Sequence, residues 1–261
     1  MSHRRKKNMK EENVDQKEPI VVALCVIHQN TVSFRWAERL RRLELPFRYL
    51  ICNTSSLLYD TAREFLVRMV LKETNLPEWV FFLDSDILPP FNAIPRLIEI
   101  AKARNIPVLS GLYWFKRLGA SNGTLEEDYT PRPSASIKIS EDLDKGSIIY
   151  NFIVDDIKPY LNKNMVLKVD AVGTGCLLIK TDIFKKLDAS NPNKPFFQYG
   201  VGRRDENTGK PLLQVTEDFY FCYRLVTELG IHPYLSTEIK CEHLFEPVGG
   251  SRRGEDGKLV L

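Results

Sequence analysis

The chain has 261 residues, 43% of them hydrophobic and 27% charged, and its 37 Lys and Arg residues slightly outnumber its 34 Asp and Glu residues. This length corresponds to one large domain or two closely joined ones, and the composition excludes a chain that is disordered or fibrous throughout. The longest apolar run, residues 20–27, is far shorter than a membrane span of about 20 residues and is followed by polar residues. We therefore expect neither a membrane helix nor a secretory signal, and a cytoplasmic location.

The excess positive charge lies at the two ends of the chain. Residues 1–18 contain six Lys or Arg against four acidic residues, and residues 251–261 contain three against two, whereas the charges between them balance. A neutral body gives no electrostatic reason to expect nucleic-acid binding. We predict a disordered basic tail over residues 1–18, a candidate for peripheral contact with a membrane, and a flexible tail over residues 251–261.

Strands and helices are predicted to alternate over the first half of the chain. Short apolar runs are typical of buried strands, and apolar residues that recur every three or four positions are typical of helices. The predicted strands are residues 20–27, 47–52, 79–83 and 108–113, and the predicted helices are residues 31–45, 55–74 and 93–104. This alternation predicts an α/β fold with a largely parallel sheet, which binds ligands at the carboxyl ends of its strands.

The second half has a less regular pattern. Two long polar segments, residues 116–136 and 189–213, are predicted as loops, and loops of this length are usually functional or mobile. Around them we predict strands at residues 148–152, 165–169 and 176–179, a helix with Phe219, Cys222, Leu225, Val226 and Leu229 on one face, and one or two terminal strands between Tyr234 and His243.

Asp84-Ser85-Asp86 directly follows the apolar strand at residues 79–83. Because alternate residues of a strand point the same way, the carboxylates of Asp84 and Asp86 can face one site. Two adjacent carboxylates at the end of an apolar strand are costly without a cation or hydrogen bonds, and oxygen ligands suit Mg²⁺ or Mn²⁺ bridged to a phosphate. A polar turn after a buried strand is the structural alternative.

Further candidates lie on either side of this motif. In Thr216-Glu217-Asp218, a carboxylate is placed to act as a general base, or the acids simply complement the dipole of the helix that Thr216 caps. Arg63 is either a phosphate contact or a solvated helix arginine, and His243 either a metal ligand or a structural strand histidine. A bulge at a strand start is the simplest interpretation of residues 173–175.

These motifs together resemble those of glycosyltransferases with the GT-A fold, close to family 2. Asp84-Ser85-Asp86 resembles the Asp-X-Asp metal motif, residues 215–218 resemble the acidic motif that holds the base, and residues 241–243 resemble the late histidine motif. Residues 172–179 resemble the small-residue strand on the acceptor side. The resemblance extends from about residue 19 to residue 246, in matching order and spacing.

The resemblance implies a single GT-A domain over residues 19–250, with a nucleotide-sugar-binding half (19–115) and an acceptor half (116–250). It also implies a role for each candidate residue. Asp84, Asp86 and His243 would bind Mn²⁺ or Mg²⁺. Arg63, together with Asp84 and Asp86, would contact the nucleotide diphosphate, and His28 and Asn53 would border the base. Asp218 would be the general base, with Glu217 beside it.

The implied activity is transfer of a sugar from a UDP- or GDP-sugar to a hydroxyl of a glycan, a lipid-linked sugar or a protein, with inversion. The Gln-X-X-Arg-Trp motif of processive synthases is absent from the sequence, and Asn53 stands where an Asp usually contacts the base, so the base stays open. Two alternatives also stay open. One is a haloacid-dehalogenase-like phosphatase with Asp84 as nucleophile, and the other is a nucleotide-sugar-binding protein without catalysis.

Overall fold

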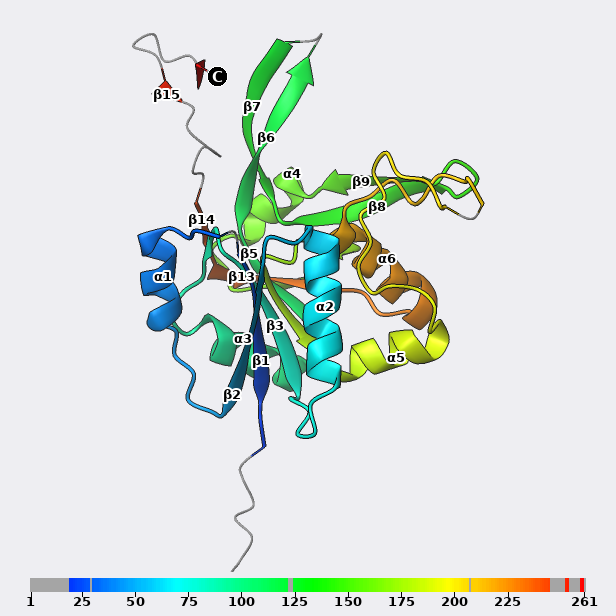
Figure 1. The fold of residues 1–261 in the computed structure, drawn as a ribbon. Coiled ribbons are helices and arrows are strands. Elements are labelled where there is room, and N and C mark those ends of the chain that lie inside the picture. The colour runs from blue at the N-terminus through cyan, green and yellow to red at the C-terminus, as the bar shows by residue number, and fades with distance from the viewer. Residues whose placement is uncertain are drawn as a thin grey trace, which may run out of the picture.

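The computed structural model describes residues 19–28, 30–121, 124–206, 208–244, 252–253 and 259–260. In the first half of the chain, strands and helices alternate as predicted (Figure 1). The elements are β1 (Val22–His28), α1 (Phe34–Arg41), β2 (Tyr49–Ser55), α2 (Tyr59–Leu71), β3 (Trp79–Asp84), β4 (Ile87–Leu88), α3 (Ala93–Arg104) and β5 (Val108–Leu112). Helices α1 and α2 are shorter than predicted, and α1 begins after Ser33, whose hydroxyl accepts a hydrogen bond from the backbone N–H of Trp36.

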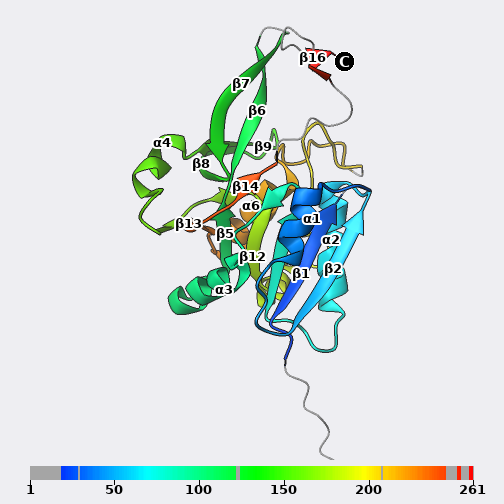
Figure 2. The same ribbon diagram turned by 90° about the vertical axis from the view of Figure 1, so that its left-hand side faces the viewer.

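The loop predicted over residues 116–136 is wrong. This segment forms an antiparallel hairpin of β6 (Trp114–Ser121) and β7 (Thr124–Pro133), followed by β8 (Ala135–Asp142). The hairpin projects from the edge of the molecule at which the central strands end (Figures 1 and 2). A hairpin outside the main sheet does not require a run of apolar residues, so the hydrophobic pattern did not indicate it.

The rest of the chain contains short strands and three further helices. They are β9 (Ser147–Phe152), α4 (Val154–Ile157), the 3₁₀ turn η1 (Lys158–Tyr160), β10 (Val166–Lys168), β11 (Ala171–Val172), β12 (Cys176–Lys180), α5 (Asp182–Ser190), α6 (Glu217–Leu229), β13 (Tyr234–Lys240), β14 (Glu242–His243), β15 (Arg252–Arg253) and β16 (Leu259–Val260). Between α5 and α6 the described chain has no helix or strand, as predicted for most of residues 189–213. The tail predicted over residues 1–18 lies outside the described residues, as does most of 251–261.

Seven strands form the central sheet in the order β10-β13-β5-β12-β3-β1-β2. Strands β1, β2, β3, β5 and β13 run in one direction, while β12 and β10 run in the other. The sheet is therefore mixed and mostly parallel. The carboxyl ends of its five parallel strands lie along one edge, together with the amino end of β12.

Helices cover both faces of this sheet (Figure 1). Apolar residues of α2, α5 and α6 pack on one face, in a cluster that includes Ala23, Val80 and Phe82 of the sheet. Helices α1 and α3 pack on the other face, around Leu24 and Phe81. Within the described residues, no helix has both the length and the apolar character needed to cross a membrane.

Candidate functional site

A pocket of about 160 Å³ opens at the carboxyl edge of the sheet. Its walls come from the ends of β1, β3 and β5, from the turn before β12, and from α2 and the start of α6. We call it the polar pocket. The residues that line it are Ile27, His28, Leu57, Tyr59, Arg63, Asp84, Ser85, Asp86, Tyr113, Thr174, Glu217 and Asp218.

Arg63 is the buried cation of this pocket. Its side chain on α2 is 3% exposed, and its Nη1 and Nη2 donate to Oδ1 and Oδ2 of Asp84, each at 3.0 Å. Its Nε lies 3.4 Å from Oε1 of Glu217. Burial would lower the pKa of Arg63, but the carboxylates of Asp84 and Glu217 outweigh it and raise that pKa above its usual value. Arg63 is therefore charged and paired, which excludes the solvated arginine of the alternative interpretation.

The two acids at the start of α6 have different surroundings. Glu217 is buried beside Arg63, and burial together with the charge of Asp218 raises the pKa of Glu217 to about 7. Asp218 is half-buried, and its Oδ1 accepts hydrogen bonds from the hydroxyl of Thr216 and, at 2.9 Å, from the backbone N–H of Phe219. Burial raises the pKa of Asp218, although the Thr216 hydroxyl and Arg63 oppose this. Thr216 is the N-cap residue, as predicted.

Strand pairing brings His243 next to Asp86. Strand β14 pairs with β4, and the backbone N–H of Leu244 donates to the carbonyl of Asp86 at 2.7 Å. Nε2 of His243 lies 3.2 Å from Oδ2 of Asp86, and Nδ1 lies 3.1 Å from the carbonyl oxygen of Trp114. Burial would lower the pKa of His243, but the carboxylate of Asp86 outweighs it and raises that pKa.

The sequence predicts that Asp84, Asp86 and His243 bind a divalent cation, and their arrangement shows how far they could do so. Within the described chain, no group of three or more His, Cys, Asp or Glu side chains is arranged to hold a metal ion. Two of the three predicted ligands, Asp86 and His243, are adjacent, whereas both oxygens of Asp84 bind Arg63. The Trp114 carbonyl fits a histidine with the proton on Nδ1 and the lone pair on Nε2, which is the form that binds metals. A carboxylate and an imidazole suit Mn²⁺ better than Mg²⁺, which prefers oxygen ligands. Asp86 and His243 are thus close enough together to bind one cation, and Asp84 can join them only if one of its oxygens leaves Arg63.

A second and larger pocket, of about 510 Å³, adjoins the first. It shares Asp84, Asp86, Tyr113 and Asp218 with the polar pocket, so Asp218 lies on the wall between the two. We call it the aromatic pocket. Its other lining residues include four aromatic ones from three elements: Phe115 of β6, Tyr150 and Phe152 of β9, and Phe219 of α6.

Tyr113 separates the two pockets and explains the glycines at residues 173–175. Its buried hydroxyl accepts a hydrogen bond from the backbone N–H of Gly175 at 3.2 Å. A Cβ atom added to Gly173 would lie only 2.1 Å from that hydroxyl oxygen. Burial raises the pKa of Tyr113 well above its usual value, so the hydroxyl stays protonated. The bulge interpretation missed this role of the glycines, which is to leave room for a tyrosine.

The two residues predicted to border the base lie in different places. His28 ends β1 and lines the polar pocket, whereas Asn53 is exposed on β2, which continues to Ser55, and is not among the lining residues. Their role therefore stays a prediction. The aromatic residues of both pockets were not predicted as site residues, although Tyr150 and Phe152, two positions apart on a strand, already indicate an aromatic face.

Comparisons with known proteins support the fold. No protein-family model matches the chain, and no curated protein matches it. Solved structures do, among them A197 from STIV, with 18% sequence identity, a TM-score of 0.53, and coverage of 93% of this chain and 94% of that one. GalNAc-T7, solved with UDP, GalNAc and Mn²⁺, matches with 11% identity, a TM-score of 0.53 and 89% of this chain, which spans only 45% of the GalNAc-T7 chain. The α/β fold of the GT-A type that the sequence predicts is therefore confirmed. At such identities the likeness concerns the fold alone.

Proposed function

We propose that this protein is a metal-dependent glycosyltransferase that moves a sugar from a UDP- or GDP-sugar to an acceptor hydroxyl with inversion. The observation that carries the proposal is the position of Asp218. It lies on the wall between a polar pocket with a buried arginine and acidic residues and a second pocket large enough for a small molecule. A base in that position can reach an acceptor in one pocket that attacks a donor in the other.

The nucleotide diphosphate would lie in the polar pocket, beside His243, which lines the adjoining aromatic pocket. Asp86 and His243, with Asp84, would hold a divalent cation, which supplies charge neutralisation of the departing diphosphate. Arg63 offsets the negative charges of Asp84 and Glu217 there, so the pocket repels a diphosphate less than its acidic residues alone would. The fold relative solved with UDP and Mn²⁺ supports this choice of ligands for the pocket.

Asp218 is the general base of the proposed reaction. Its carboxylate takes the proton of the acceptor hydroxyl while that oxygen bonds to the anomeric carbon, and the bond from this carbon to the diphosphate oxygen breaks. Burial makes the carboxylate a stronger base, since it raises the pKa of Asp218. Glu217 contacts Nε of Arg63, while Asp84 binds its two Nη atoms, and so Glu217 helps to position the guanidinium. A single displacement of this kind inverts the anomeric configuration.

The proposal is tested by separating donor binding from transfer. We expect UDP- or GDP-sugars with Mn²⁺ to raise the melting temperature of the wild type and of Asp218→Asn alike, whereas transfer or donor hydrolysis falls about 10²- to 10⁴-fold in the variant. Asp182→Asn, an exposed carboxylate on α5, is the control and should keep full activity. The proposal fails if no nucleotide-sugar stabilises the protein, or if a generic phosphoester is hydrolysed with transient phosphorylation of Asp84. Inversion fails if the product has the anomeric configuration of the donor.

A further inference from the structure

The aromatic pocket contains a connected row of rings. Phe115 and Phe152 meet edge to face with 5.1 Å between ring centroids, Phe152 and Phe219 lie 6.3 Å apart, and Tyr150 meets Phe219 at 4.8 Å. All four rings are half-buried. Because aromatic side chains normally bury most of their area in a core, a row that lines a cavity presents unused apolar surface to whatever enters it.

The row packs against buried neighbours. Ile148, Val215 and Tyr220 are buried and form a small core of their own, against which Tyr150 and Phe219 pack. The guanidinium carbon of Arg132 lies 5.6 Å from the centroid of the Phe152 ring. Rings supported in this way lose little freedom when a ligand binds, which favours a preformed binding surface.

The end of the pocket next to Asp218 is polar. Besides the residues shared with the polar pocket, it contains the hydroxyl of Thr216, the hydroxyl of Ser134 and the imidazole of His243. The pocket thus has an apolar wall and, at one end, groups that accept or donate hydrogen bonds. Its acidic members are Asp84, Asp86 and Asp218, and no Lys or Arg is among the described residues that line it. This charge disfavours an anionic ligand.

We propose that the aromatic pocket binds a neutral oligosaccharide acceptor, with a sugar ring stacked on Phe152 and Phe219 and its reactive hydroxyl directed at Asp218. A pyranose ring fits both walls, because its C–H groups form apolar faces while its hydroxyls form a polar rim. An alkyl chain would leave the polar end unmatched, and a phosphate that carries no metal ion would meet three carboxylates. The assignment of this sugar as acceptor rests on the proposed function, whereas its binding to the rings does not.

Direct binding tests the proposal without any donor. The protein is titrated with an array of neutral oligosaccharides, with uronic-acid oligosaccharides and with an alkyl phosphate, and binding is followed by saturation-transfer NMR and calorimetry. We expect neutral oligosaccharides to bind best, and Phe152→Leu and Phe219→Leu, which keep an apolar side chain and so the fold, to weaken that binding roughly two- to ten-fold. Phe34→Leu, at a side chain that is 84% exposed on α1, is the matched control and should bind as the wild type does.

The outcomes separate this proposal from the proposed function. Three results would overturn the acceptor site, even if UDP-sugars with Mn²⁺ still stabilise the protein. They are equal oligosaccharide binding by Phe152→Leu and the wild type, no binding of any neutral oligosaccharide, and preferred binding of the alkyl phosphate. Conversely, ring-dependent oligosaccharide binding by a protein that no nucleotide-sugar stabilises upholds the site and rejects the glycosyltransferase. In each variant the shift caused by UDP-sugar should equal that of the wild type, because neither phenylalanine lines the polar pocket.

Discussion

The guanidinium of Arg63 lies between two carboxylates, those of Asp84 and Glu217, and is almost completely buried. A buried charge of this kind is tolerated only because its partners are present. Arg63 therefore connects α2 to the end of β3 and the start of α6, and these are the elements that also carry the proposed metal ligand and general base.

Removal of this charge should be costly. We expect Arg63→Met to lower the free energy of unfolding by about 3–5 kcal/mol, because it leaves two buried or half-buried carboxylates unpaired. Arg35→Met is the control, since its ion pair with Glu242 is largely exposed and such pairs contribute less than about 1 kcal/mol. Urea unfolding measures both variants, and equal stabilities would contradict the buried pairing.

The pH dependence of stability should report on Glu217. Its pKa in the folded protein is raised to about 7, so the folded protein binds this proton more tightly than the unfolded chain does. The tighter binding of the Glu217 proton by the folded state therefore stabilises the protein fully below the ordinary pKa of a glutamate. This stabilisation is lost as the pH rises toward 7. We expect Glu217→Gln to flatten the fall in stability between about pH 4.5 and pH 7, and Glu38→Gln, at an exposed position of α1, to serve as the control and leave this fall as in the wild type. A profile that is the same in Glu217→Gln and the wild type would contradict this.

At the scale of elements, the sequence predicts those helices and strands whose apolar residues form a strong local pattern. Helix α3 has the predicted bounds, Ala93–Arg104, because its apolar residues recur regularly and Asn105 adopts the left-handed conformation that ends a helix. Helix α5 was missed although Ile183, Phe184 and Leu187 are all buried on its inner face, so the signal was present but short. The β6–β7 hairpin was missed because it contributes no strand to the central sheet.

The residues of the candidate site also divide into those with a local sequence pattern and those that only the fold brings together. Asp84, Asp86, Glu217 and Asp218 were predicted as site residues because they sit at a strand end and a helix start, and all four line the polar pocket. The aromatic pocket was not found, because its rings come from β6, β9 and α6, and only the folded chain shows that these elements meet.

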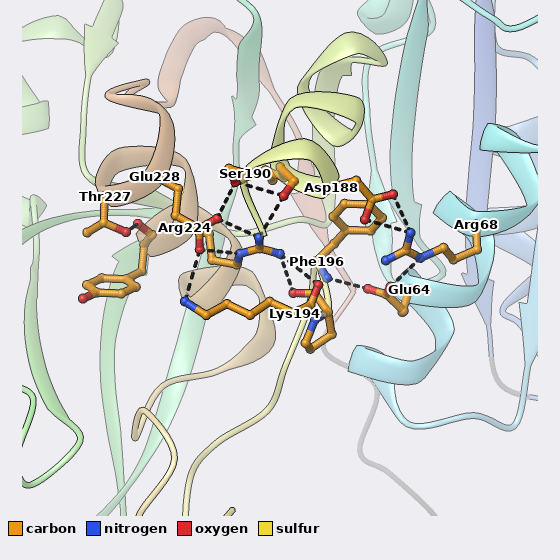
Figure 3. Close-up of polar contacts among 12 residues, drawn as sticks. Glu64, Arg68, Asp188, Ser190, Lys194, Phe196, Arg224, Thr227 and Glu228 are labelled. Carbon is orange, nitrogen blue, oxygen red and sulfur yellow. Dashed lines mark hydrogen bonds and ion pairs between the residues drawn. The ribbon is translucent and has the colours of Figure 1, made fainter. Parts of the chain in front are cut away.

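One wall of the aromatic pocket belongs to the irregular segment between α5 and α6, which side chains fasten to two helices (Figure 3). Arg224, 1% exposed, binds Glu228 and donates to the carbonyls of Leu187, Lys194 and Pro195. Glu64 of α2 accepts from the backbone N–H of Phe196 at 2.7 Å and pairs with Arg68. These contacts replace the backbone hydrogen bonds that a regular element would supply.

Removal of the Glu64 carboxylate should make the segment between α5 and α6 open more often near Phe196. We expect Glu64→Ala to speed hydrogen exchange at the amides of Phe196 and Phe197, because both donate to that carboxylate in the wild type. Glu64→Gln keeps an acceptor oxygen and should have a smaller effect, and Glu99→Ala, on the opposite face of the sheet, should have none there. Unchanged exchange in Glu64→Ala would show that the Arg224 contacts and the buried phenylalanines hold the segment without Glu64.

At the scale of the whole molecule, the candidate site joins the two halves of the chain. Asp84 and Arg63 come from the first half and Asp218 and His243 from the second, and β12 and β13 of the second half lie in the same sheet as β3 and β5 of the first. A ligand that contacts both sets of residues binds only when both halves are folded, so it should stabilise them as one unit.

Calorimetry should therefore show one transition that a UDP- or GDP-sugar with Mn²⁺ moves as a whole. At a free ligand concentration of about 100 times Kd, the folded state gains about 2.7 kcal/mol, which for a domain of this size raises Tm by roughly 5–10 °C. Without metal the shift should be smaller, because Asp84 and Asp86 then repel the diphosphate. In Asp86→Asn the shift should lose most of its dependence on Mn²⁺. Two separate transitions, of which the ligand moves only one, would show that the halves fold independently and that the residues of the second half do not contact the donor.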